Sequence, residues 1–307
     1  MKNVLVIYYT QTGQAKEAID SILKPFNNNG FNVHYLLVKP KKQFPYPWKY
    51  TEFFDIFPET VQAKPCELEE IHIDLSINYD LIILAYQPWF LSVCVPINSF
   101  LKTEKANLIF KNTPVVTVIN CRNMWISAQE KMKGLLKNLN ANLIGNITFV
   151  DRSSNLTSLV TVLAFILKGT KEKFLGIFPK YGVNTKDIED APKFGKLIIT
   201  HLKNNTLDNL QTELVKNNAV NIRGNIMLME GRGNLLFPLY ANFITKKGNA
   251  GSKERKTRVR IFGIVLPLVI LIASPIITII SRLAPLIAKN KFQKQIDYYL
   301  QNSLKEK

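Results

Sequence analysis

Short apolar runs alternate with amphipathic stretches through the first 150 residues. Five runs have the length and composition of strands that are buried on both faces of a parallel sheet. These runs cover residues 4–9, 31–38, 80–85, 114–119 and 143–150. Apolar positions at helical spacing predict helices over residues 15–26 and 127–139. Strands joined by crossover helices predict an α/β fold with a doubly wound, five-stranded parallel sheet.

Three further segments do not belong to a minimal fold of this kind. Residues 40–66 are rich in aromatic residues and proline, which predicts a long loop or short helices over one edge of a site. Residues 156–167 are mostly apolar but too few to cross a bilayer, so they predict a buried helix or an apolar lid. An amphipathic helix is expected over 187–201, followed by a smaller region to about residue 248 that contains Glu230.

The last part of the chain has the pattern of a membrane-associated tail. Residues 261–281 carry no charge, which is long enough for a transmembrane helix, although Pro267 and Pro275 interrupt the segment. Basic residues flank it on both sides, so the charge pattern favours no orientation. A full span and a hairpin that enters and leaves on the cytoplasmic side both remain open.

Charge strengthens the membrane interpretation. The net charge of +17 would first suggest nucleic acid, but residues 251–307 alone hold 11 Lys and Arg against 3 Asp and Glu. Because this charge flanks the most apolar segment, we expect contact with a membrane through residues 253–294 and no nucleic-acid partner. The chain starts directly with a strand, so no secretory signal is expected. These features predict a location at the cytoplasmic face of the inner membrane.

We therefore expect three units along the chain. Residues 1–200 would form the α/β domain, with an insertion at about 151–185. Residues 201–250 would form a small extension, and residues 251–307 a basic linker with the apolar tail.

The first predicted strand ends in a polar loop that is followed at once by a helix. Backbone amides of such a turn converge on an anion, and the helix N-terminus adds partial positive charge. This loop, residues 10–14, resembles the phosphate loop of flavodoxins, which implies a flavodoxin-like domain that binds flavin mononucleotide (FMN). Ala15 stands where flavodoxins usually place another hydroxyl, so one phosphate contact would be missing. The loop comprises Thr10, Gln11, Thr12, Gly13 and Gln14.

Two further loops follow the third and fourth predicted strands. Pro88, Trp89 and Phe90 are similar to the stretch that borders the flavin ring in flavodoxin-like quinone reductases. In the next loop, Asn123 and the amides around Cys121 would contact the ring's pyrimidine edge, as the same resemblance implies. Arg122 would stabilise negative charge on the reduced flavin or pair with the phosphate. The three histidines show no metal spacing, so no metal is expected.

Several segments throughout the chain share a pattern with one known family. They are residues 1–14, 79–87, 98–102, 121–125, 175–180 and the apolar tail. Together they resemble the dialkylresorcinol condensing enzyme family of bacterial pigment biosynthesis. This resemblance implies that the protein aromatises a dialkylcyclohexanedione to a dialkylresorcinol by hydride transfer to FMN. Tyr86, Arg122 or the aromatic loop 44–57 would orient the ring or help to remove a proton. The substrate would be a lipophilic alkyl-substituted ring, and a ketosynthase and an acyl carrier protein would be partners.

Other functions remain open at this point. A membrane-associated NAD(P)H quinone reductase or flavin reductase would share the fold, the cofactor and the tail. An electron carrier fits less well, because carriers of this fold are usually acidic. A flavin-free scaffold of a biosynthetic complex is a further alternative. True condensing chemistry would need Cys94 or Cys121 as nucleophile, and a homodimer is also conceivable.

Overall fold

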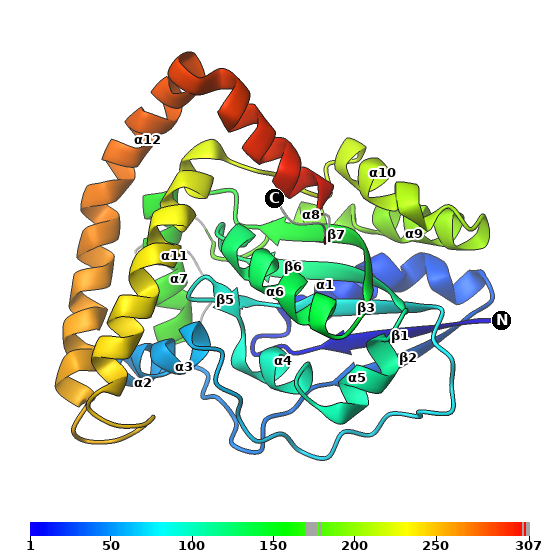
Figure 1. Ribbon diagram of the computed structural model, residues 1–307, viewed down its shortest axis with the longest axis horizontal. Helices are drawn as coiled ribbons and strands as arrows, with labels where there is room; N and C mark the ends of the chain where they lie inside the picture. The colour runs from blue at the N-terminus through cyan, green and yellow to red at the C-terminus, as the bar shows by residue number, and fades with distance from the viewer. Residues whose placement is uncertain (170–176, 178–179, 303, 305–307) are drawn as a thin grey trace.

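The computed structural model describes residues 1–169, 177, 180–302 and 304, and it contains one five-stranded parallel sheet (Figure 1). The strand order is β2-β1-β3-β6-β7, the 2-1-3-4-5 order of flavodoxin-like folds. The predicted fold class is therefore confirmed. The strands are β1 (Lys2–Tyr8), β2 (Phe31–Leu37), β3 (Leu81–Tyr86), β6 (Pro114–Cys121) and β7 (Asn142–Val150). A separate hairpin consists of β4 (Pro88–Trp89) and β5 (Ser92–Val93).

Helices cover both faces of the sheet. The chain moves from β1 to β2 in one direction and from β3 through β6 to β7 in the other. Right-handed crossovers therefore put α1 on one face and α4, α5 and α6 on the other. Helices α8 and α9 pack beside α1. Their bounds are α1 (Gln14–Leu23), α4 (Val95–Phe100), α5 (Glu104–Phe110), α6 (Ile126–Asn138), α8 (Thr185–Glu189) and α9 (Pro192–Lys203).

Proline explains two differences from the predicted helices. The helix expected over 187–201 is divided into α8 and α9, because Pro192 has no N–H to continue a helix and occupies the first turn of α9. The helix expected over 15–26 ends at Leu23, and a 3₁₀ helix with Pro25 in its first turn follows over Lys24–Asn28.

The segments 40–66 and 156–167 form helices at the carboxyl edge of the sheet. Residues 40–66 contain the short helices α2 (Tyr50–Asp55) and α3 (Phe57–Val61). The stretch 156–167 lies within α7 (Asn155–Lys168), which is half-buried along much of its length. Most of the segment 175–180 lies outside the described residues.

The region after residue 203 packs on the sheet and then extends across its end. Leu210 and Leu214 of α10 (Leu210–Lys216) belong to the main core, and both side chains lie over Gly145 of β7. Helices α11 (Gly224–Thr245) and α12 (Lys256–Gln301) then run side by side (Figure 1). The division of the chain at residues 200 and 250 stays a prediction, although residues 210–227 share the core of the α/β domain.

Helix α12 contains the predicted apolar tail. Its segment Lys256–Leu283 is long and apolar enough to cross a membrane. Pro267 and Pro275 lie within the helix without ending it. Residues at both ends of α12 form polar contacts with the α/β domain.

Candidate functional site

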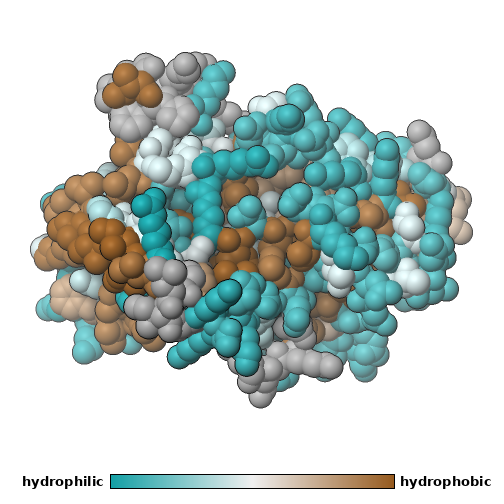
Figure 2. Space-filling view, turned by 90° about the horizontal axis from the view of Figure 1, so that it is seen from above, coloured by the Kyte–Doolittle hydropathy of each residue, from teal (hydrophilic) through white to brown (hydrophobic). Residues whose placement is uncertain are grey.

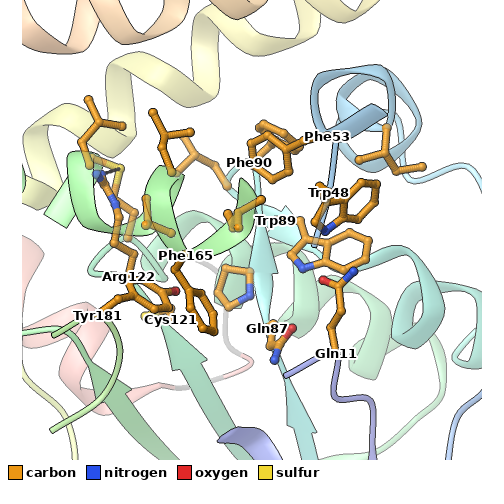
Figure 3. A pocket seen from close by; sticks show the side chains of 18 of the residues that line it. Gln11, Trp48, Phe53, Gln87, Trp89, Phe90, Cys121, Arg122, Phe165 and Tyr181 are labelled. Atoms are coloured by element: carbon orange, nitrogen blue, oxygen red, sulfur yellow. Dashed lines mark hydrogen bonds between the residues drawn. The ribbon is translucent and has the colours of Figure 1, made fainter. Parts of the chain in front are cut away.

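A cavity of about 240 Å³ lies at the carboxyl ends of β1, β3 and β6 (Figure 3). One water molecule needs only about 10–15 Å³ by the same measure. The three loops predicted to carry the site therefore meet at one cavity. They contribute Gln11, Thr12 and Gln14 after β1, then Gln87, Pro88, Trp89 and Phe90 after β3, and Asn120, Cys121, Arg122 and Met124 at the end of β6.

The loop after β1 is shaped for an anion. Gly13 has a φ of 86°, a left-handed conformation that other residues adopt only with strain. Its N–H donates to Oγ1 of Thr10 at 3.0 Å, so both residues hold the turn without lining the cavity. The Asn120 side chain donates to the Gln14 carbonyl at 3.3 Å and ties the loop to β6. The first-turn amides of α1 lack intrahelical partners and so can bind a phosphate.

Aromatic side chains form one wall of the cavity. The Trp89 ring makes edge contacts with Phe44 at 5.2 Å, Tyr9 at 5.8 Å and Trp48 at 6.2 Å between ring centroids. These contacts fix the indole in place (Figure 3). The aromatic loop 44–57 therefore covers the site, as its composition predicted. A rigid, flat apolar wall suits a planar heterocycle.

The opposite wall carries the half-buried cation Arg122 (Figure 3). Arg122 donates to the Asn155 side-chain oxygen at 2.8 Å and to its backbone carbonyl at 3.3 Å. Among the described residues, no carboxylate lies within 4.0 Å of its guanidinium. Burial lowers the pKa of Arg122 to about 10, so the group stays charged at neutral pH. A cation that lines a cavity and has no carboxylate in direct contact is suited to a developing oxyanion.

Two residues that line the cavity each have a buried polar atom with unused hydrogen-bonding capacity. The Tyr46 hydroxyl and Oδ1 of Asn120 are buried and have no partner within the described part of the chain. Buried polar groups are normally hydrogen-bonded, so an unpartnered pair calls for an explanation. A ligand with both donors and acceptors would supply the missing partners.

The structure corrects the expectation for Tyr86. Its side chain is fully buried, and its hydroxyl donates to Oε1 of Gln129 at 2.8 Å rather than facing the cavity. Burial also raises the pKa of Tyr86 well above its ordinary value. Tyr86 is therefore part of a core hydrogen-bond network, not a proton-transfer group of this site.

Asn123 is also displaced from the cavity. Its amide donates to the Asn155 side chain at 3.1 Å, and Asn120, three residues earlier, lines the cavity instead.

The cysteine thiols of this region are not activated. Cys121 lines the cavity, but burial raises the pKa of its thiol. Burial raises the pKa of Cys94 to about 12. Both thiols are therefore protonated at neutral pH, which argues against a condensing nucleophile.

Sequence reasoning did not identify one residue that positions this site, which is Glu230 of α11. Its buried carboxylate accepts N–H bonds from Trp125 at 2.8 Å, Ile126 at 3.3 Å and Ser127 at 2.8 Å. It thereby caps the N-terminus of α6 directly after the Arg122 loop. Burial raises the pKa of Glu230 to about 7, although the three N–H donors favour the ionised form.

This raised pKa predicts a pH-dependent stability. Between pH 4.5 and 7, the unfolded chain ionises Glu230 while the folded chain keeps its proton. The carboxyl therefore contributes its full stability below pH 4.5, and the contribution is lost as pH rises through 7. The loss amounts to about 3 kcal/mol. We expect Glu230→Gln to remove this part of the dependence of the unfolding free energy on pH. Denaturant unfolding at several pH values would measure it. Equal slopes in the two proteins would contradict the assignment.

Comparisons with known proteins give similarity at the level of the fold. No family model and no curated protein matches the chain. An FMN-bound flavoprotein from Lactobacillus acidophilus is 19% identical with a TM-score of 0.40, over 48% of this chain and 93% of the other. An archaeal flavodoxin is 10% identical with a TM-score of 0.38, over 66% and 99%. RosB, solved with 8-demethyl-8-formylriboflavin-5'-phosphate, is 10% identical with a TM-score of 0.38, over 70% and 81%.

Proposed function

We propose that this protein is an FMN-dependent oxidoreductase that acts on a lipophilic ring compound. The observation that carries the proposal is the meeting of three strand-end loops at one cavity. Folds with this strand order bind their ligand outside the carboxyl ends of the strands, at the switch between β1 and β3. The cavity combines an anion-binding turn, a rigid aromatic wall and unpartnered polar atoms, which together match a phosphorylated heterocycle.

Different residues of the cavity would hold different parts of FMN. The loop 10–14 and the first turn of α1 would take the phosphate, and Trp89 would lie against the ring system. Asn120 and Tyr46 would supply polar partners to the ring. When bound, the flavin supplies hydride acceptance, and the protein contributes orientation and electrostatics.

The specific reaction that we propose is aromatisation of a dialkylcyclohexanedione to a dialkylresorcinol, as the family resemblance implies. This reaction removes one hydride, which a bound flavin would accept, and one proton from a neighbouring carbon, which would leave to solvent; the ring then tautomerises to the diphenol. Arg122 would stabilise the ring oxygen as negative charge develops on it. The side chains of Leu159, Leu163 and Leu266 line the cavity and would accommodate the alkyl substituents.

An anaerobic absorption spectrum of FMN-loaded protein tests this function. We expect that adding a dialkylcyclohexanedione bleaches the band of oxidised flavin and forms the resorcinol in equal amount. Bleaching by NAD(P)H but not by the dione would instead indicate a quinone or flavin reductase. Failure to take up FMN would contradict both functions and leave the flavin-free scaffold.

A further inference from the structure

Helix α12 exposes an unusually long apolar stripe. Its members recur every three or four residues, so they share one side of the helix. The neighbouring helix α11 adds exposed Leu235, Leu236, Leu239 and Phe243. Figure 2 shows the hydrophobic side chains gathered on the side of the molecule where these helices lie. The stripe comprises Ile261, Ile264, Leu268, Ile272, Ile276, Ile279 and Leu283, and together with the four α11 residues it is called the apolar face below.

A partner must cover this face. Isolated exposed apolar residues are normal, but soluble proteins rarely expose a contiguous apolar surface of this extent. The opposite side of the same helix is already packed, since Val259, Phe262, Ser274 and Ile277 are buried in the protein. Residues 261–281 of α12 are therefore uncharged on all sides, and only one side meets its own domain.

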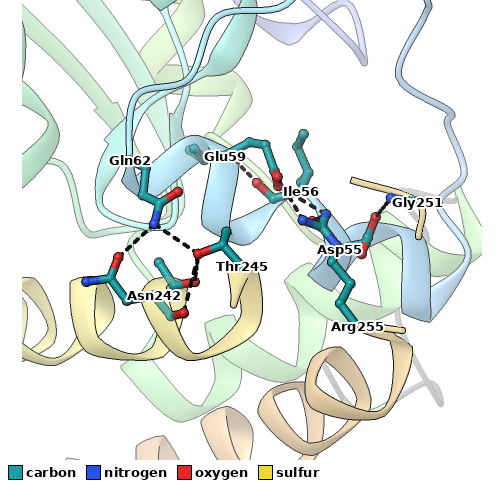
Figure 4. Close-up of polar contacts among 10 residues, drawn as sticks. Asp55, Ile56, Glu59, Gln62, Asn242, Thr245, Gly251 and Arg255 are labelled. Carbon is teal, nitrogen blue, oxygen red and sulfur yellow. Dashed lines mark hydrogen bonds and ion pairs between the residues drawn. The ribbon is translucent and has the colours of Figure 1, made fainter. Parts of the chain in front are cut away.

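The start of α12 is anchored to the α/β domain (Figure 4). Arg255 is fully buried and donates to Asp55 Oδ1 at 2.7 Å and to Glu59 Oε1 at 2.8 Å. About two turns later, the Phe262 ring stacks on Phe57 of α3 with centroids 3.9 Å apart.

The end of α12 returns to the same domain. Gln129 of α6 donates to the buried Asn302 side chain at 3.0 Å, and Tyr298 donates to Glu130 at 2.9 Å. Gln129 is also the residue that accepts from Tyr86, so the end of α12 joins the core hydrogen-bond network. A helix that spans a bilayer must place its ends about 30 Å apart on opposite sides of the hydrocarbon. Two ends held by one domain do not allow that arrangement.

Charge at both ends of the apolar face identifies the partner. Lys253, Lys256 and Arg260 are exposed near the start of the stripe, and Arg282 and Lys289 near its end. Lys246 and Lys247 add two more exposed cations at the end of α11. Apolar helices with basic flanks are typical of proteins that lie in the interface of an anionic membrane. A groove on another protein would not require cations at both ends.

The cavity lies directly behind this face. Leu266, Pro267 and Ile270 are half-buried residues on the inner side of α12, and they line the cavity together with Leu159 and Leu163 of α7. The same helix therefore separates the apolar face from the cavity.

We propose that α11 and α12 dock in the plane of an anionic bilayer without crossing it. Alkyl chains would then pass from the lipid into the cavity between α7 and α12. The docking stands on the apolar face, the flanking cations and the two anchors, whereas the alkyl passage rests on the proposed function.

Vesicle flotation of the flavin-free protein tests the docking independently of any reaction. We expect binding to vesicles of phosphatidylethanolamine with phosphatidylglycerol, and much weaker binding to pure phosphatidylcholine. Leu268 and Ile272 are 51% and 66% exposed, so Leu268→Gln with Ile272→Gln should not disturb the core. The pair should weaken vesicle binding about tenfold. Leu108→Gln, at a 59% exposed position on α5, is the matched control and should bind as the unaltered protein does.

A labelling experiment separates docking from crossing. Single cysteines replace Lys253 or Lys294, on either side of the apolar segment, and the protein is added to preformed vesicles. We expect an impermeant maleimide to label both positions from outside, above the background of the three natural cysteines. Protection of one position until detergent is added would show a crossing helix and overturn the proposal. Absence of vesicle binding together with dimers in solution would also overturn it, because a second copy would then cover the face.

Discussion

Replacing Arg122 by Gln is expected to slow oxidation of the dione by about 10²–10³-fold while leaving FMN binding nearly unchanged. Arg122 lies on the wall opposite Trp89 and has no carboxylate partner among the described residues. Its guanidinium is held by Asn155 but is not neutralised by a carboxylate in direct contact, so its charge can act on a ligand in the cavity. The phosphate loop lies at another part of the cavity, so the binding of FMN should depend little on Arg122.

Two control variants make the Arg122 result specific. Arg122→Lys keeps the charge but loses the forked contact with Asn155, so we expect activity between the two extremes. Arg152→Gln removes a largely exposed cation that pairs with Asp187, and it should leave the rate unchanged. Anaerobic single-turnover kinetics, with FMN binding measured on the same samples, would show the effect. Full activity of Arg122→Gln would contradict the assigned role.

Replacing Arg255 by Met is expected to lower the free energy of unfolding by about 3–5 kcal/mol. The buried guanidinium bonds Asp55 and Glu59, and its Nη2 also donates to the Asp55 carbonyl at 2.6 Å (Figure 4). Without it, two carboxylates remain against apolar surface with no cation. Since Asp55 also accepts from the Gly251 N–H at 2.7 Å, the start of α12 should loosen as well.

Lys256→Met is the matched control for this anchor. Lys256 is the next residue and is exposed, so its replacement should change the unfolding free energy by less than about 0.5 kcal/mol. Denaturant unfolding would measure both variants. Limited proteolysis between residues 246 and 260 would report loosening of α12 in Arg255→Met alone. Equal stability of the two variants would contradict the anchoring role.

The sheet and the three loops were predictable because parallel strands have a simple pattern. Each strand is a short apolar run, and all carboxyl ends meet at one edge, so loops 10–14, 87–90 and 120–122 had to approach one another. The orientation of the Tyr86 side chain could not be predicted in this way. Its strand is buried on both faces, so alternation does not say which face a side chain takes. The Gln129 that binds its hydroxyl lies 43 residues away.

Helix α11 and its role were not predictable from local pattern. Gly231, Gly233 and Pro238 argue against a helix, yet all three lie within its 22 residues. Contacts with α3 and α12 outweigh these local preferences. The capping of α6 by Glu230 joins residues more than 100 positions apart, and no spacing rule indicates such a pair. Tertiary packing, rather than sequence propensity, determines this part of the site.

Titration of the flavin-free protein with FMN, followed by quenching of flavin fluorescence, tests the central claim most directly. The account predicts saturable binding of one FMN per chain. It also predicts much weaker binding of riboflavin, because the loop 10–14 and the first turn of α1 would have no phosphate to hold. Binding of neither compound would contradict the assignment of this cavity as a flavin site.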